Sequence, residues 1–372
     1  MKTLFACLGL FCCAAAGSAF AEPLQEADRD LDTVRQGQAA LMQTHNHRGP
    51  VSLENFVRVC GESLCLGGQP FIIRGATTYG AHGPKSAVAS VVAAGLNTLE
   101  LVEYEPDFHN LASVTSEDTW RLVDQYLAEA SQAKIHVILH FASFGQSLDA
   151  SKINPLTADS LWDAFLSSAT NRRNTVNGRI YKNDPTIAII ELFGEINPAK
   201  TSDETGQIAN FFKNNLKRLK ELDPNHIVSS GGFSYLDWDS KIPWQTIMDD
   251  PNDAICDVEI NAFTDLSVTI PKVTQHCKGK PWLLAAWSSC LKKAPDSPND
   301  INYAKDDPAM AAHARDMYDL VLGKAVLGAQ PAMPAVGSVV WNLGATASLP
   351  TCDIGPQTPD TLQVLKDYGK KR

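Results

Sequence analysis

The sequence predicts a parallel (β/α)₈ barrel, or TIM barrel, preceded by a β-hairpin. Eight short apolar segments of strand length follow Phe56, and amphipathic segments with helical spacing separate them. Parallel strands covered by helices are almost continuously apolar, whereas the strands of a sandwich follow one another without helices. The eight expected strands are Phe71–Thr77, Leu96–Val102, His136–Phe141, Ile187–Phe193, His226–Ser230, Val258–Phe263, Trp282–Trp287 and Ser338–Leu343.

The segments between the expected strands carry the period of buried helices. The clearest stripe has apolar residues three and four positions apart, which presents one apolar face to a core. Its members are Ile208, Phe211, Phe212, Leu216 and Leu219. The sequence contains no internal repeat and no linker, so residues 51–372 are expected to form a single barrel domain.

The first 21 residues have the pattern of a secretory signal peptide. An apolar run from Leu4 to Ala16 follows a lysine, and Ala19-Phe20-Ala21 offers small residues for cleavage. The run is too short to span a bilayer, so we expect cleavage after Ala21 and a periplasmic or secreted protein. Residues 22–50 are polar and are interpreted as a leader before the barrel.

Nine cysteines occur, and the six that follow the signal suggest disulfides in an exported chain. Cys60 and Cys65 flank the turn of the expected hairpin, which would bring them close together. The pairs Cys256–Cys277 and Cys290–Cys352 are plausible, but the sequence leaves the connectivity open. No Cys-x₂-Cys pair occurs, so no zinc site is expected among the cysteines.

Composition limits the class of partner. The formal net charge is -10 and no basic patch is present, which argues against nucleic acid and anionic membranes as partners. The chain also has no glycine-rich phosphate loop. We therefore expect a neutral ligand, no metal or organic cofactor, and a monomer.

One expected strand delivers a carboxylate to the place where barrel enzymes keep their chemistry. The apolar run Ile187–Ile190 ends in a polar turn that contains Glu195. In a (β/α)₈ barrel, catalytic groups lie at the carboxyl ends of the strands. Glu195 is therefore a candidate general acid, and its role depends on a second group beside it.

Several segments carry a resemblance to a known family: Gly68–Gly75, Gly95–Leu99, Asn171–Ile187, Leu222–Gly231, Gly279–Leu284 and Gly337–Trp341. On these segments the chain resembles glycoside hydrolase family 5 (clan A), and within it the endo-β-1,4-mannanases, from about Phe56 to the C-terminus. The resemblance implies a cleft for a neutral β-linked polysaccharide, mannan or another β-glycan, at the carboxyl ends of the strands.

The same resemblance assigns catalytic positions. Such enzymes retain configuration with two glutamates whose carboxyls lie about 5–5.5 Å apart. The acid/base falls on Glu195, and Gly194 stands where the family has an asparagine that bonds the sugar 2-hydroxyl. The nucleophile motif Lys-Pro-x-Leu-Leu-x-Glu ends here at Ala286, and no glutamate follows Glu259.

Further departures concern the groups around the nucleophile. Glu100 stands where the family has an arginine on the second strand, and Asn261 stands for the histidine of a His-x-Tyr pair on the sixth. Trp341 is kept where the family stacks a sugar ring. Without a nucleophile no glycosyl-enzyme intermediate forms, so ordinary retaining hydrolysis is not expected. A hydrolase with rearranged chemistry and a carbohydrate-binding pseudoenzyme or scaffold both remain open.

The remaining candidates each have two interpretations. Glu259 is a second carboxylate for an inverting pair, which needs a separation of about 6.5–9.5 Å, or an ion-pair partner at the barrel mouth. His140 contacts substrate or is a structural histidine. Trp287 stacks on a sugar or packs in the core. Glu191 is expected to be structural.

Overall fold

The structure is a computed structural model. The chain divides into two contact-defined units, Met1–Val51 and Ser52–Arg372, and every residue that the structure describes lies in the second unit. The expected signal peptide and polar leader lie outside the described residues. The described ranges are 53–78, 83–102, 117–142, 159–193, 202–233, 242–261, 264–289, 291–292, 303–304, 306–344 and 353–370.

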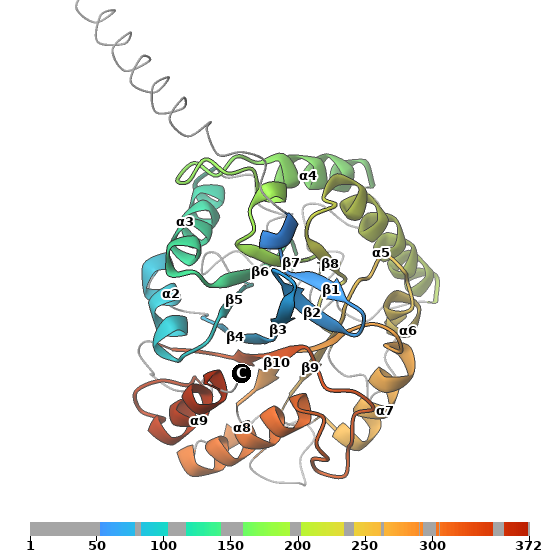
Figure 1. Cartoon of the computed structure of the whole chain (residues 1–372). Helices are drawn as coiled ribbons and strands as arrows, with labels where there is room; N and C mark the ends of the chain where they lie inside the picture. Colours follow the sequence, from blue (N-terminus) through green and yellow to red (C-terminus); the bar gives the residue numbers. More distant parts are fainter. Residues whose placement is uncertain are drawn as a thin grey trace, which may run out of the picture. The chain divides into compact units, whose positions relative to one another are not determined.

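Eight parallel strands form a nearly closed barrel, which confirms the predicted fold class (Figure 1). They are β4 (Ile73–Thr77), β5 (Thr98–Leu101), β6 (His136–His140), β7 (Ile187–Glu191), β8 (Ile227–Ser229), β9 (Cys256–Ile260), β10 (Trp282–Ser288) and β13 (Gly337–Trp341). Their order in the sheet is β8-β7-β6-β5-β4-β13-β10-β9. A parallel bridge between Phe233 and Val258 brings the two edge strands together.

The strand β9 differs most from its expected range. It begins two residues earlier than Val258, at Cys256, and ends at Ile260 instead of Phe263. The cause is the neighbouring strand, because Cys256 pairs with Trp282 at the start of β10. The correction adds Asp257 to the strand, and this residue matters for the site.

Helices surround the barrel, and their apolar faces pack on the outside of the strands (Figure 1). The expected stripe on α5 is confirmed, since its five apolar residues are at most 2% exposed. No helix of the described ranges is long and apolar enough to cross a membrane. The described helices are α2 (Pro84–Ala93), α3 (Glu117–Ala133), α4 (Asp159–Asn171), α5 (Ser202–Leu222), α6 (Trp244–Met248), α7 (Leu266–His276), α8 (Asp307–Val321) and α9 (Pro359–Gly369), with short 3₁₀ turns η1 (Leu53–Asn55) and η2 (Tyr181–Asn183).

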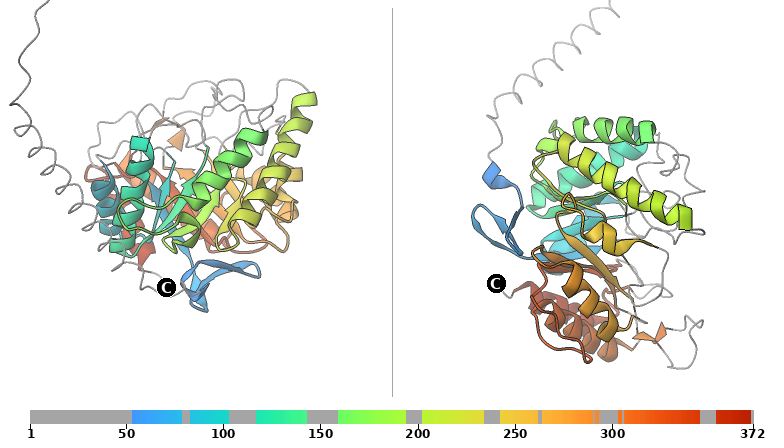
Figure 2. Two further views of the ribbon diagram at one scale, coloured as in Figure 1. Left: turned by 90° about the horizontal axis from the view of Figure 1, so that it is seen from above. Right: turned by 90° about the vertical axis from the view of Figure 1, so that its right-hand side faces the viewer.

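A small antiparallel sheet of β1 (Arg58–Cys60), β2 (Ser63–Leu66) and β3 (Gln69–Phe71) covers one end of the barrel (Figure 2). The chain passes directly from β3 into the amino end of β4. Leu64 of β2 is 1% exposed and belongs to the same apolar cluster as the barrel interior. Because apolar side chains fill this amino end, a site is expected at the opposite, carboxyl end.

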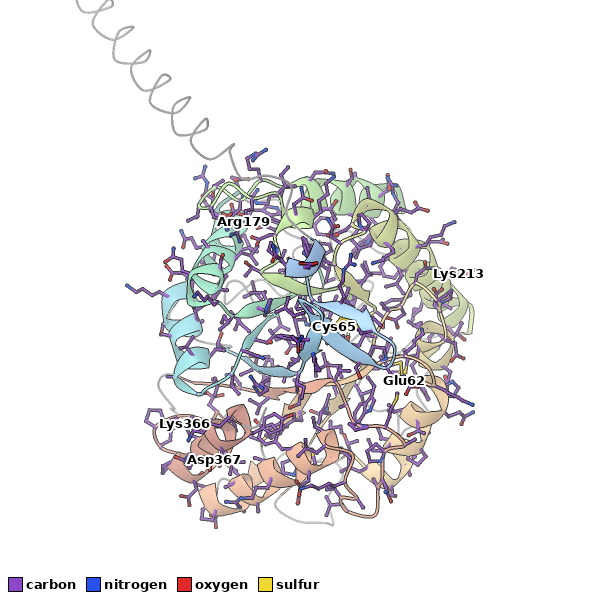
Figure 3. The ribbon with its side chains drawn as sticks, viewed as in Figure 1. Glu62, Cys65, Arg179, Lys213, Lys366 and Asp367 are labelled. Carbon is purple, nitrogen blue, oxygen red and sulfur yellow. A yellow bond between two sulfur atoms is a disulfide. The ribbon has the colours of Figure 1, made fainter. Side chains whose placement is uncertain are left out.

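Two of the expected disulfides are present, Cys60–Cys65 and Cys256–Cys277. The first closes the hairpin turn, where Cys65 and Glu62 are labelled in Figure 3. Glu62 accepts a hydrogen bond of 3.1 Å from the backbone nitrogen of Gly279, which ties the hairpin to the segment before β10. Cys290 and Cys352 lie outside the described residues, and their pairing stays a prediction. A further two-stranded ribbon joins β11 (Leu291–Lys292) to β12 (Tyr303–Ala304).

Residues 171–187, one of the segments that carry the family resemblance, fold around the buried carboxylate of Asp124 on α3. Arg172 donates two hydrogen bonds to Asp124 (3.1 and 2.7 Å), and the Tyr181 hydroxyl donates a third of 2.7 Å. Burial alone would raise the pKa of Asp124, but these donors together with Thr175 hold it below its ordinary value. The segment therefore links α3, α4 and β7 through its hydrogen bonds to Asp124.

Asp253, before β9, is fully buried and accepts hydrogen bonds from the backbone nitrogen and hydroxyl of Ser230 (2.9 and 3.0 Å). Burial raises its pKa to about 7, although the charge of Lys280 acts in the opposite direction and that of Asp250 adds to the rise. The folded protein therefore holds a proton that the unfolded chain releases near pH 4. The contribution of this carboxyl to the free energy of unfolding therefore falls as the pH rises from about 4 to 7.

The variant Asp253→Asn is expected to remove that decline. The amide keeps the acceptor for the Ser230 nitrogen and carries no charge to desolvate. The difference in free energy of unfolding between the variant and the parent protein, measured by urea titration, should shift in favour of the variant by on the order of 2 kcal/mol from pH 5 to pH 8. The control Asp367→Asn, on the exposed face of α9 (Figure 3), should give the same difference at both pH values. A pH-independent effect at position 253 would contradict the assignment.

Candidate functional site

The interior of the barrel has an apolar layer near the amino end and a polar layer near the carboxyl end. Successive side chains of a strand point to opposite faces, so Ile138 and His140 face the same way, as do Ile189 and Glu191. Ile138 and Ile189 belong to the interior apolar cluster, which places the polar partners one layer further along. This polar layer, at most 4% exposed, consists of Glu100, His140, Glu191, Ser229 and Asp257.

The imidazole of His140 lies between two carboxylates. Its Nε2 is 3.2 Å from Oε1 of Glu100 and 2.9 Å from Oε2 of Glu191. Burial lowers the pKa of His140, but the charge of Glu191 and the hydrogen bond with Glu100 outweigh it and raise the pKa to about 10. Only 4% of the His140 surface is exposed, so its contacts in this structure are those of a structural histidine enclosed in the barrel.

A further carboxyl group, Asp257, reaches the same interior from β9. The hydroxyl of Ser229 on β8 donates a hydrogen bond to it. Burial, followed by the charge of Glu191, raises the pKa of Asp257 well above its ordinary value. Its Oδ1 is buried and has no hydrogen-bond partner among the residues that the structure describes. The polar layer is thus strongly acidic, and His140 is its single basic side chain within the described strands.

Glu259 follows Asp257 by two residues and therefore shares its face of β9. It is half-buried, one level nearer to the carboxyl end of the barrel. A Cβ built on Gly232, just after β8, would lie 2.9 Å from Cγ of Glu259. Gly232 thus leaves the space that the Glu259 side chain needs at the barrel mouth.

β10 separates two of the expected site residues. Ala286 is half-buried and packs against the interior apolar cluster. Trp287 is fully buried on the other side, with ring centroids 5.6 Å from Tyr318 and 6.0 Å from His313 of α8. The packing interpretation therefore accounts for Trp287, and its ring offers no surface to a sugar in this structure.

Trp341 ends β13 and is half-buried, as is Asn261 immediately after β9. Beside Trp341, Asn342 accepts a hydrogen bond of 3.1 Å from the Thr77 hydroxyl and donates one of 3.0 Å to Asp353. These contacts anchor the end of β13 to β4 and to the segment before α9.

Apart from Trp287, which packs against α8, the expected site residues fall into three groups. Glu100 and His140 are enclosed in the barrel, whereas Glu259, Asn261, Ala286 and Trp341 are half-buried at the carboxyl ends of their strands. Glu195 and Gly194 lie outside the described residues, so their distances to the other groups stay predictions. Glu191 and Asp257, which the sequence analysis did not place in a site, complete the enclosed group.

Comparisons with known proteins agree with this architecture. The sequence model described as GH family 5 beta-mannosidase-like matches residues 118–252. Mannan endo-1,4-beta-mannosidase 8 of Oryza sativa subsp. japonica is 27% identical over 223 residues, which span 50% of this chain and 59% of that relative.

Solved structures share the fold at lower identity. The endo-1,4-beta-mannanase of Rhizomucor miehei superposes with a TM-score of 0.62 at 17% identity, covering 85% of this chain and 100% of that one. The endo-beta-1,4-mannanase of Thermotoga petrophila gives a TM-score of 0.60 at 14% identity, covering 82% and 77%. The expectation from the sequence motifs is confirmed: in part of its sequence and in its fold, this chain is similar to the mannanases of glycoside hydrolase family 5.

Proposed function

We propose that the protein is exported and binds a neutral β-linked polysaccharide, mannan or a related β-glycan, at the carboxyl end of its barrel without ordinary retaining hydrolysis. Trp341 is the proposed stacking surface for a sugar ring. Glu259, Asn261 and Gly194 are proposed to line the same cleft. The protein acts as a monomer in this proposal.

One observation carries the proposal: a methyl group stands at the expected nucleophile position. Ala286 lies near the carboxyl end of β10, the seventh strand of the barrel, and is half-buried beside the interior. On the second strand, Glu100 takes the expected place of an arginine and lies against His140. A methyl group cannot attack a sugar, and a glutamate cannot stabilise a neighbouring anionic nucleophile as arginine does.

The alternative is a hydrolase with rearranged chemistry, in which Glu195 is the acid and Glu259 the second carboxylate. The half-buried position of Glu259 at the end of β9 favours this alternative over one that would use the enclosed Glu100. Such a pair would invert configuration through a water molecule if its carboxyls were about 6.5–9.5 Å apart.

The proposal predicts binding without turnover. Mannohexaose, xylohexaose and cellohexaose are to be titrated into the full chain by calorimetry, while release of reducing ends is followed on the matching polysaccharides. We expect at least one of these glycans to bind, and none to be cleaved. Trp341→Ala should weaken binding by about 10-fold or more, because an aromatic platform contributes on the order of 1–2 kcal/mol.

The matched control is Trp287→Phe. This ring packs against α8, so the variant should lower the melting temperature and leave glycan affinity unchanged. Absence of binding to every glycan would contradict the proposal. Turnover that disappears in Glu195→Gln would instead establish the rearranged hydrolase.

A further inference from the structure

We propose that Glu100, His140 and Glu191 form a binding site for one first-row divalent metal ion, Zn²⁺ or Mn²⁺, inside the barrel. The three residues come from three adjacent strands, β5, β6 and β7, which pair in register: Glu100 lies opposite Ile138, and His140 lies opposite Glu191. The proposal concerns the barrel interior and does not depend on glycan binding.

The donor atoms of the three residues lie close together. Each residue offers one ligand atom, and all three atoms lie within 4.8 Å of one another. Nε2 of His140 is 3.2 Å from Glu100 Oε1 and 2.9 Å from Glu191 Oε2. Ligand atoms that are each about 2.1 Å from one ion are about 3.0 Å apart at a right angle and about 3.4 Å apart at a tetrahedral angle. The two separations from His140 lie close to these values, and the two carboxylate oxygens, at most 4.8 Å apart, would approach each other to bind the same ion.

The second observation is the state of the Glu191 carboxylate. It is 1% exposed, and apart from the ion pair of 2.9 Å with His140 Nε2, neither oxygen has a hydrogen-bond partner among the residues that the structure describes. One N–H of an imidazole can point at only one of two carboxylates, and here the hydrogen bond goes to Glu100. A buried carboxylate without hydrogen bonds is costly. A divalent ion would replace the proton on His140 Nε2, which is released to solvent, and would coordinate both carboxylates.

The negative charge around these three residues favours a cation as the bound species. Asp257 lies close enough for the charges of Glu191 and Glu100 to act on it electrostatically, and Glu259 lies one level above Asp257. One imidazole nitrogen and carboxylate oxygens are donors that Zn²⁺ and Mn²⁺ accept, whereas Ca²⁺ and Mg²⁺ prefer oxygen ligands alone. The donor set therefore predicts a transition metal in preference to the harder ions.

The test begins with the full chain stripped by a chelator and dialysed. Zn²⁺, Mn²⁺, Ca²⁺ or Mg²⁺ is added, and bound metal is measured by mass spectrometry together with the melting temperature. We expect about one Zn²⁺ or Mn²⁺ per chain, and a rise in melting temperature of about 4 °C at a free concentration of ~100 times the Kd. Ca²⁺ and Mg²⁺ should give no comparable rise.

Variants decide where the ion binds. Glu191→Gln and Glu100→Gln should each weaken metal affinity by at least about 10-fold, because each removes an anionic ligand. Two controls should keep the full response: Asp253→Asn, a buried carboxyl outside the three ligands, and His276→Gln, which removes a half-buried histidine near Asp249.

A response that survives both ligand variants, or a chain that binds no metal, would overturn the proposal. If the ligand variants do not fold, Co²⁺ in the unaltered protein is the deciding probe. Visible absorption of an enclosed, low-symmetry Co²⁺ site supports the proposal, and the spectrum of hydrated Co²⁺ overturns it.

Discussion

Replacing Gly337 by alanine is expected to lower the free energy of unfolding by about 2–6 kcal/mol. Gly337 begins β13 and pairs with Ile73 at the start of β4. A Cβ at this position would lie 2.1 Å from the carbonyl oxygen of Ile73 and 2.6 Å from its Cβ, and the residue has a φ of +150°. The clash is with backbone, so the two strands would have to separate where the hairpin sheet enters the barrel.

Urea denaturation and the melting temperature measure this effect, and Gly206→Ala is the matched control. Gly206 lies in α5, where an added Cβ meets no atom within 4 Å. Alanine there should stabilise the protein by about 0.5–1 kcal/mol, since it favours the helix more than glycine does. A Gly337→Ala protein that melts within a degree of its parent would show that the strands β4 and β13 are not packed as described.

The barrel could be predicted from the sequence because each strand is buried on both faces. Ile187–Ile190 is apolar without interruption, and the structure buries every residue of β7. Strand ends were harder to predict, since pairing with a neighbour sets them. β9 begins at Cys256 because β10 begins opposite it at Trp282, and apolar content alone does not show this register.

One of the segments that carry the family resemblance supports the fold. Residues 171–187 bind the buried carboxylate of Asp124 through Arg172, Thr175 and Tyr181. Removing Arg172 would leave the buried Asp124 carboxylate without its countercharge, which lowers stability whatever reaction the barrel mouth performs. Likeness in this segment therefore predicts the fold strongly and the chemistry weakly.

The enclosed acidic group could not be assembled from the sequence. Glu100 and His140 are 40 residues apart, and each lies in a largely apolar strand. Their contact depends on strand register, since β5 and β6 must align within one residue for both side chains to face inward. Apolar and acidic residues alternate in Cys256-Asp257-Val258-Glu259-Ile260. This alternation predicts that Asp257 and Glu259 share one face of the strand, once the strand is known to begin at Cys256.

The acidic interior also predicts how a restored nucleophile would behave. Under the proposed assignment, Ala286→Glu adds a carboxylate to a barrel mouth that already holds Glu259, above the enclosed Glu100, Glu191 and Asp257. Like charges and burial both raise the pKa of a carboxyl group, and each unit of increase lowers the ionised fraction up to tenfold. The single variant should therefore show little or no hydrolysis of mannan at neutral pH.

The double variant Ala286→Glu with Glu100→Arg should cleave mannan at least about 10-fold faster than the single variant. Arginine at position 100 removes one negative charge, adds a positive one and lowers the pKa of a nearby carboxyl by about one unit or more. Release of reducing ends is the measurement, and Ala286→Gln with Glu100→Arg is the isosteric control that should remain inactive. Adding Glu195→Gln should abolish the restored activity if Glu195 is the acid/base. Equal activity of the single and double variants would show that charge at Glu100 does not limit the site, and activity of the unaltered chain would refute the assignment of Ala286 as the nucleophile position.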